Sequence, residues 1–218
     1  MASVLQKQKG ALRKAMRVML ASLSPEEIQA QSAQITTTLL ALPEFRASRA
    51  VSCFLSMPPP ACEVDTSAVV AAVLRTDKRL YVPKMTDTAR GRMDVFRIFD
   101  EPDLAALPRG QWGIREPEAE YLGQARPAGI AFDRSLSRLG YGKGYYDRFL
   151  AAYAQGGAGR PKLVALALRE QILVEGQVPA GELDWRVDMI VGPDGIVLPR
   201  SGSPSASPSP PPSATDAA

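Results

Sequence analysis

The most informative stretch of the chain reads Arg138-Leu139-Gly140-Tyr141-Gly142-Lys143-Gly144-Tyr145-Tyr146-Asp147. Its three glycines at alternate positions let the backbone approach a ligand closely and present its amides, and Lys143 adds a positive charge. A helix is predicted directly after them, and the N-terminal amides of a helix also favour an anion. We therefore predict a phosphate-binding loop here. The alternative is a glycine-rich turn that only reverses the chain.

This loop matches neither of the two common nucleotide-binding motifs. A Walker P-loop needs Ser or Thr after Gly-Lys to hold magnesium, whereas Gly144 follows Lys143 in this chain. The spacing of the glycines also differs from that of the dinucleotide-binding fingerprint. A phosphate loop of another family is therefore expected.

Outward from the loop, helix-like and strand-like segments alternate along the chain. The predicted helices are Ser3 to Ala21, Pro25 to about Leu42, Thr66 to Arg75 and Tyr145 to Tyr153. The predicted strands are Ala50 to Leu55, Arg79 to Pro83, Asp94 to Phe99, Leu163 to Leu168, Met189 to Val191 and Ile196 to Leu198. Such alternation is typical of an α/β fold with a mostly parallel sheet covered on both faces, and ligands of these folds bind beyond the carboxyl ends of the strands.

The composition narrows the classes of chemistry that the chain can perform. The 218 residues are 45% hydrophobic and 22% charged, and they suffice for one globular domain. Histidine is absent, which excludes Ser-His and Cys-His nucleophile pairs and histidine metal sites. Two cysteines, Cys53 and Cys62, make neither a disulfide framework nor a zinc motif. We expect one domain over residues 1–199, followed by a disordered Ser/Pro-rich tail over residues 200–218.

The loop resembles the signature of the 5-formyltetrahydrofolate cyclo-ligase family, also called methenyltetrahydrofolate synthetases. Further segments resemble the family in the same order, from about Lys7 to Val191. They are Lys9-x-x-Leu12-Arg13, Phe54 to Met57, Glu63 to Thr66, Ala165 to Ile172, and Val178 to Asp188. The resemblance implies a three-layer α/β/α sandwich and a ligase that uses ATP and Mg²⁺ to cyclise 5-formyltetrahydrofolate to 5,10-methenyltetrahydrofolate, releasing ADP and phosphate.

The same resemblance implies roles for individual residues. Lys143 and Arg138 are the expected catalytic residues, and Asp147 and Asp184 the expected magnesium ligands. The expected ATP contacts are Lys9, Gly10, Ala11, Leu12, Arg13, Arg138, Leu139, Gly140, Tyr141, Gly142, Lys143, Gly144, Tyr145 and Tyr146. The expected folate contacts are Arg13, Leu55, Met57, Glu63, Trp112, Tyr141, Gly142, Lys143, Gly144 and Tyr145.

The residues alone leave simpler alternatives open at several of these positions. Lys9 and Arg13 share one helical face, which could be an ordinary solvated basic face. Tyr145 and Tyr146 could serve helix packing, and Trp112 could be an anchor in the core or on the surface. The family often carries arginine where this chain has Tyr141, so a side-chain contact to phosphate is in question there.

One expected strand is missing from the pattern. Family members carry an apolar strand just before the segment that corresponds to Gly129-Ile130-Ala131-Phe132-Asp133, but residues 120–128 contain no apolar run. We therefore predict that a central strand before Gly129 has been deleted, which favours an inactive or non-catalytic family member that binds ATP or folate as the alternative function. A basic nucleic-acid-binding module is a remote alternative, because only the sequence pI near 8.9 supports it.

The remaining expectations concern partners and location. The expected ligands are ATP and 5-formyltetrahydrofolate, with or without a polyglutamate tail, and neither nucleic acid nor a membrane is expected as a partner. The chain is expected to be a cytoplasmic monomer. Because the first twenty residues are basic and free of acids, a mitochondrial location is the alternative.

Overall fold

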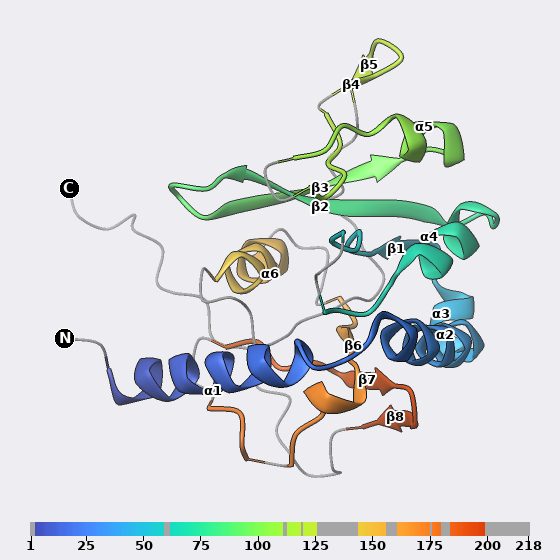
Figure 1. Cartoon of the computed structure of the whole chain (residues 1–218). Coiled ribbons are helices and arrows are strands. Elements are labelled where there is room, and N and C mark those ends of the chain that lie inside the picture. The colour runs from blue at the N-terminus through green and yellow to red at the C-terminus, as the bar shows by residue number, and fades with distance from the viewer. Residues whose placement is uncertain are drawn as a thin grey trace, which may run out of the picture.

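The computed structural model describes residues 3–58, 62–110, 113–118, 120–125, 144–155, 161–174, 176–179 and 184–198 (Figure 1). Its helices are α1 (Val4–Leu20), α2 (Pro25–Ala41), α3 (Pro43–Ala47), α4 (Ser67–Leu74), α5 (Glu101–Ala106) and α6 (Tyr145–Gln155), with a 3₁₀ turn, η1 (Arg169–Gln171). Its strands are β1 (Ala50–Ser52), β2 (Arg79–Asp87), β3 (Arg92–Ile98), β4 (Glu120–Tyr121), β5 (Gln124–Ala125), β6 (Val164–Leu166), β7 (Met189–Gly192) and β8 (Gly195–Val197). The predicted tail over residues 200–218 lies outside the described residues.

The first two helices begin where the sequence places capping residues. The Ser3 hydroxyl accepts a hydrogen bond from the Gln6 amide at the start of α1. At the start of α2, Ser24 Oγ accepts from the Glu27 amide at 3.2 Å, and Glu27 Oε2 accepts from the Ser24 amide at 2.8 Å. This reciprocal pair is a capping box that satisfies two otherwise orphaned donors. The second helix ends at Ala41, close to the predicted end at about Leu42, and Pro43 begins α3.

The strands form two three-stranded sheets and one short hairpin. In the first sheet, β1 runs parallel to β2 and β2 runs antiparallel to β3. In the second, β6 runs parallel to β7 and β7 runs antiparallel to β8. The α/β class is confirmed, and each of the two three-stranded sheets of described strands is mixed rather than strictly parallel. The connections from β2 to β3 and from β7 to β8 are too short for a parallel crossover, so these strands must pair as hairpins.

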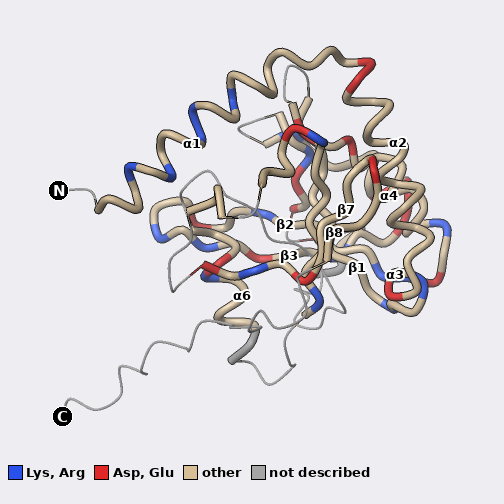
Figure 2. Tube along the Cα trace, turned by 90° about the horizontal axis from the view of Figure 1, so that it is seen from below, with Lys and Arg blue, Asp and Glu red and all other residues tan. Residues whose placement is uncertain are grey.

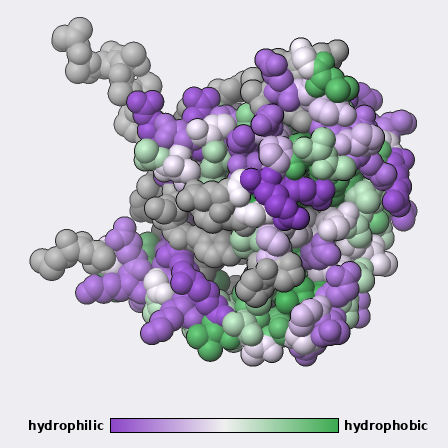
Figure 3. Space-filling model, turned by 45° about the horizontal axis from the view of Figure 1, so that its top comes forward, coloured by the Kyte–Doolittle hydropathy of each residue, from purple (hydrophilic) through white to green (hydrophobic). Residues whose placement is uncertain are grey.

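Helices cover both faces of the first sheet, which gives three layers. Leu80 and Val82 of β2 belong to the main core with residues of α2 and α4. Tyr81, which lies between them, points to the opposite face and packs with Val95 of β3 and Tyr153 of α6. This alternation along β2 places α2 and α4 on one side of the sheet and α6 on the other, as the strand periodicity requires. Hydrophilic residues cover much of the described surface drawn in Figure 3, with hydrophobic residues between them.

The two three-stranded sheets share one core but are not paired to each other. Within the described residues, no strand pairs with the outer edge of β1 or with that of β6. An apolar cavity of about 40 Å³ lies between these edges, lined by Val51 and Cys53 on one side and by Val164 and Leu166 on the other. In the stretch before Gly129, residues 120–125 contain the short β4–β5 hairpin and residues 126–128 lie outside the described ranges, so the predicted deletion stays a prediction.

Candidate active site

The first turn of α6 begins directly after the last glycine of the predicted phosphate loop. Gly144 has a φ of +64°, in the left-handed region that favours glycine, and its carbonyl accepts a hydrogen bond from the Arg148 amide at 3.1 Å. Tyr145, Tyr146 and Asp147 follow and are half-buried. A carboxylate in the first turn of a helix is favoured by the helix dipole. The structure therefore places three predicted site residues on one rigid turn.

Asp147 connects this turn to the segment that precedes β7. One of its carboxylate oxygens, Oδ1, accepts a hydrogen bond from the Trp185 amide at 3.3 Å. Trp185 itself is buried and packs with Leu150 of α6 and Leu163, which holds the two segments together. The second predicted magnesium ligand, Asp184, immediately precedes Trp185. The two carboxylates, which are 37 positions apart along the chain, thus belong to neighbouring parts of the structure.

Asp184 is paired with a residue of the first helix. The ammonium group of Lys9 lies 2.5 Å from Asp184 Oδ2, and the two side chains are 16% and 34% exposed. This ion pair brings α1 to the segment that Asp147 also contacts. The structure therefore unites Lys9, Asp147 and Asp184, from three separate parts of the chain, in one cluster that we call the charged cluster.

The inward face of α1 carries the basic residues that the resemblance singles out. Lys9 and Arg13 are half-buried, like Leu12 and Met16, whereas Lys14 is exposed. The helix contains lysine and arginine but no acidic residue, as Figure 2 shows along its length. The alternative of an ordinary solvated face does not describe Lys9, which lies against the protein and is engaged by Asp184. Gly10 and Ala11, two further predicted ATP contacts, lie on the exposed side.

A second group of predicted residues follows β1. Glu63 Oε1 accepts a hydrogen bond from the Met57 amide at 2.6 Å, so these two predicted folate contacts lie side by side. Ser56 supports the same turn, because its hydroxyl accepts from the Thr66 amide at 2.7 Å. Leu55 is buried in the main core. Its packing role is therefore visible, while a role as pocket wall stays a prediction.

Several predicted residues lie outside the described ranges. They are Trp112, Arg138, Leu139, Gly140, Tyr141, Gly142 and Lys143. Among the described residues, no group of three or more His, Cys, Asp or Glu side chains could hold a metal ion. A magnesium ion at the charged cluster would therefore take at most the two carboxylates from the described protein and its remaining ligands from water or nucleotide phosphates, which is how Mg²⁺ is commonly bound.

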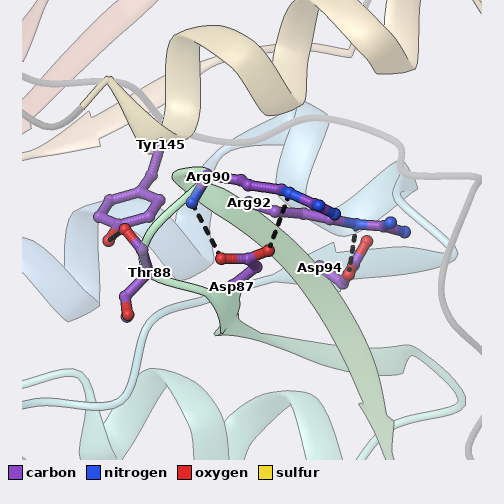
Figure 4. A network of polar contacts seen from close by, with 6 residues as sticks. All are labelled: Asp87, Thr88, Arg90, Arg92, Asp94 and Tyr145. Atoms are coloured by element: carbon purple, nitrogen blue, oxygen red, sulfur yellow. Dashed lines mark hydrogen bonds and ion pairs between the residues drawn. The ribbon is translucent and has the colours of Figure 1, made fainter.

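The structure also shows contacts that the sequence analysis missed. Asp188, from the same motif as Asp184, accepts from the Leu163 amide at 2.5 Å and so joins β6 to β7 rather than lying in the site. Arg148, one residue beyond the predicted signature, donates from Nε to the Gly91 carbonyl at 3.1 Å. Tyr145 Oη lies 3.5 Å from the Thr88 carbonyl in the same hairpin (Figure 4). Only the position of Arg148 directly after the signature could have drawn attention to it.

The site does not depend on a thiol of the core. Burial raises the pKa of the Cys53 thiol from 9.0 to about 12, against a smaller opposing effect of its hydrogen bond with Thr66. A thiol needs to ionise before it can act as a nucleophile. Cys53 is therefore inert at neutral pH, and the described chemistry is that of charged side chains and backbone amides.

Comparison with known proteins gives one consistent result. The model of the 5-formyltetrahydrofolate cyclo-ligase family matches residues 5–193. A mouse protein named 5-formyltetrahydrofolate cyclo-ligase is 32% identical over 196 residues, covering 85% of this chain and 94% of the mouse protein. An Arabidopsis thaliana protein named 5-formyltetrahydrofolate cyclo-ligase, mitochondrial, is 32% identical over 215 residues, covering 88% of this chain and 76% of the relative.

A solved structure agrees with the sequence comparisons. The chain is similar to the 5,10-methenyltetrahydrofolate synthetase of Aquifex aeolicus, with a TM-score of 0.66 and 29% identity over 90% of this chain and 95% of that chain. A synthetase of the same name from Mycoplasma pneumoniae, 21% identical with a TM-score of 0.53, has the same fold. Among the described residues, no helix has both the length and the apolar character that a membrane span requires.

Proposed function

The chain belongs to the 5-formyltetrahydrofolate cyclo-ligase family, and on that premise we propose that it converts 5-formyltetrahydrofolate and ATP to 5,10-methenyltetrahydrofolate, ADP and phosphate. The observation that supports the proposal best is the charged cluster. Lys9 from α1, Asp147 from α6 and Asp184 from the segment before β7 were each expected at the ATP and magnesium site, and they lie together. Such convergence of distant residues is expected at a functional site and has no local cause.

The proposed chemistry overcomes a poor leaving group. The formyl oxygen attacks the γ-phosphorus of ATP, so ADP leaves and the oxygen becomes part of a phosphate ester. The N10 nitrogen then attacks the formyl carbon, loses its proton and closes the ring, and the original formyl oxygen departs within phosphate. Phosphoryl transfer of this kind depends on positioning and on neutralisation of charge rather than on a protein nucleophile. The chain's lack of histidine is therefore no obstacle.

The residues of the chain have separate tasks in this scheme. Lys9 contributes a positive charge that binds the phosphates of ATP. Lys143 and Arg138 of the predicted loop bind the same phosphates, and Gly144 connects this loop to α6. Glu63 accepts hydrogen bonds from the pterin amino and ring N–H groups, since an ionised carboxylate is only an acceptor. Arg13 and Tyr145 contact both ATP and folate in this proposal.

Magnesium fits the chemistry of the charged cluster. Asp147 and Asp184 supply two hard oxygen donors, and carboxylates with phosphates and waters are the ligands that Mg²⁺ prefers. When bound, the ion would neutralise negative charge on the phosphates. The Asp184 carboxylate is paired with the Lys9 ammonium. Lys9 therefore holds this carboxylate in position, and its own positive charge suits the nucleotide phosphates.

A second candidate is a family member that binds ATP or folate without turnover. It is favoured by the sequence, because residues 120–128 contain no apolar run where the family carries a strand. The two candidates differ in product formation, since both bind ligand. We further propose a monomer in the cytoplasm, with the mitochondrion as the alternative; gel filtration and cell fractionation check these two points.

The test is the near-ultraviolet absorbance of the methenyl product in a mixture of the full chain, 5-formyltetrahydrofolate, ATP and Mg²⁺. Absorbance should rise in the complete mixture and stay flat when ATP, Mg²⁺ or the folate is left out. Lys9→Met should slow the reaction, whereas Lys7→Met, which changes an exposed lysine of the same helix, should not. Saturable binding of ATP and folate without product would support the second candidate and overturn the first.

A further inference from the structure

Arg148 lies over a glycine of the β2–β3 hairpin. Gly91 is buried although it is part of a turn, and its φ of +66° lies in the left-handed region. A Cβ atom at this position would come within 1.9 Å of Arg148 Nη2, while Arg148 Nε donates to the Gly91 carbonyl at 3.1 Å. The planar guanidinium can therefore rest on the turn only because residue 91 has no side chain.

The same guanidinium contacts the end of the predicted phosphate loop. A Cβ atom on Gly144 would lie 3.1 Å from Arg148 Nη1, which is a tight contact. The Tyr145 ring centroid is 5.8 Å from the Arg148 guanidinium carbon, within the range of a cation–π interaction. Arg148 thus touches both Gly91 and Gly144 with one rigid group, which a lysine ammonium could not do.

The β2–β3 hairpin that contacts Arg148 is stabilised by hydrogen bonds of its own side chains. Asp87 Oδ1 accepts from the Arg90 amide at 2.9 Å across the turn, and Asp94 Oδ2 accepts from Arg92 Nε at 3.2 Å (Figure 4). The same Asp94 oxygen accepts from the Thr86 hydroxyl at 2.7 Å. Farther along, β3 packs against α6 through Val95 and Tyr153. A turn supported in this way can fix the position of whatever rests on it.

We propose that Arg148 is a positioning residue for the reaction: it locks the turn at Gly144 and the first turn of α6 against the β2–β3 hairpin. We assign it no direct contact with substrate. Its effect passes through Gly144, Tyr145 and Asp147, so it governs how well the first turn of α6 is arranged to receive nucleotide phosphates. The inference rests on the proposed function, because the value of this arrangement to the enzyme is defined by ATP.

The experiment compares Arg148→Met, Arg148→Lys and Gly91→Ala with a matched control, Gly123→Ala. Gly123 has a φ of +74° in another hairpin, but a Cβ atom there meets nothing within 4 Å, so the control carries the same backbone strain without the clash. Each of the three variants should raise the KM for ATP by about five- to tenfold and change kcat less, because misplaced binding groups are the defect. The control should stay within about twofold of the wild type.

The double variant Gly91→Ala/Arg148→Met gives the sharper result. Since both changes break one contact, the KM of the double variant should match that of the worse single variant instead of multiplying the two effects. Multiplied effects, or an unchanged KM for ATP in Arg148→Met, would overturn the proposal. If Gly123→Ala raised the KM for ATP as much as the three test variants do, the proposal would also be overturned, because the cause would then be general destabilisation.

Hydrogen exchange separates failure of this inference from failure of the proposed function. In the free protein, Arg148→Met and Gly91→Ala should each speed amide exchange in residues 144–150 by about fivefold or more, and Gly123→Ala should not. If the wild type lacks turnover but exchange changes as stated, the proposed function falls while the lock at Gly144 stands. Unchanged exchange in both variants overturns the lock whatever the activity.

Discussion

Removal of the Lys9 ammonium tests the charged cluster most directly. In the structure, Lys9 Nζ and Asp184 Oδ2 are 2.5 Å apart, and their side chains are 16% and 34% exposed. Hydrogen bonds to charged groups contribute about 1.5–3 kcal/mol when shielded, and fully exposed ion pairs about 0.2–1 kcal/mol. The partial exposure of Asp184 places this pair between the two cases. We expect Lys9→Met to lower the free energy of unfolding by about 1–2 kcal/mol.

Thermal unfolding followed by circular dichroism measures this loss. A change of 1 kcal/mol shifts the Tm of a domain of this size by about 2–4 °C, so Lys9→Met should lower Tm by about 2–8 °C. The control is Lys7→Met on the same helix, because Lys7 is exposed and forms no ion pair with a described residue. Its Tm should stay within about 1 °C of the wild type, as is usual for surface substitutions.

The double variant Lys9→Met/Asp184→Asn identifies the pair as the cause. Lys9→Met removes the ammonium from Asp184, and Asp184→Asn removes the carboxylate from the half-buried Lys9 ammonium, so each single variant loses the same ion pair. The double variant removes both charges and should be more stable than the sum of the single losses predicts, by about 1 kcal/mol. Strictly additive losses, or equal Tm values for Lys9→Met and Lys7→Met, would refute the reasoning.

Three further predictions follow from other parts of the structure. Ser24→Ala removes the capping box of α2 and should cost about 1 kcal/mol, measured by urea unfolding; a loss below the experimental scatter would contradict the role of the cap. The Cys53 thiol ionises above pH 9.0 when unfolded but stays protonated to about 12 when folded, so the folded state binds more protons and stability falls as pH rises above 9. Between pH 9 and about 12, the stability of the wild type relative to Cys53→Ala should therefore fall by about 1.4 kcal/mol per pH unit. A stability difference that does not change with pH would exclude the raised pKa of Cys53. Finally, ATP with Mg²⁺ should raise the wild-type Tm, EDTA should abolish most of the rise, and Asp147→Asn should reduce it; equal shifts in both proteins would exclude Asp147 as a ligand.

The sequence predicted the bounds of helix α2 more accurately than the bounds of strands β1 and β2. The helix predicted from Pro25 to about Leu42 is α2 (Pro25–Ala41), because the capping box at Ser24 and the proline at residue 43 act on adjacent backbone groups. Strand lengths differed: β1 ends at Ser52 rather than Leu55, and β2 continues to Asp87 rather than Pro83. A strand extends as far as it has a partner, and β3 pairs with β2 along this whole length. That partner is not visible in the local sequence.

The sequence alone determined the α/β class, the family resemblance, the exclusion of histidine chemistry and the residue types expected at the phosphate site. Each depends on composition or on neighbours along the chain. Only the tertiary structure decided that Lys9 meets Asp184 across 175 positions, that Asp147 reaches the same segment, and that Arg148 rests on Gly91 of a distant hairpin. Those contacts arise because α1 packs beside η1 and the segment before β7, and α6 packs against β3, all far away in sequence. Local periodicity carries no record of which surfaces will pack together.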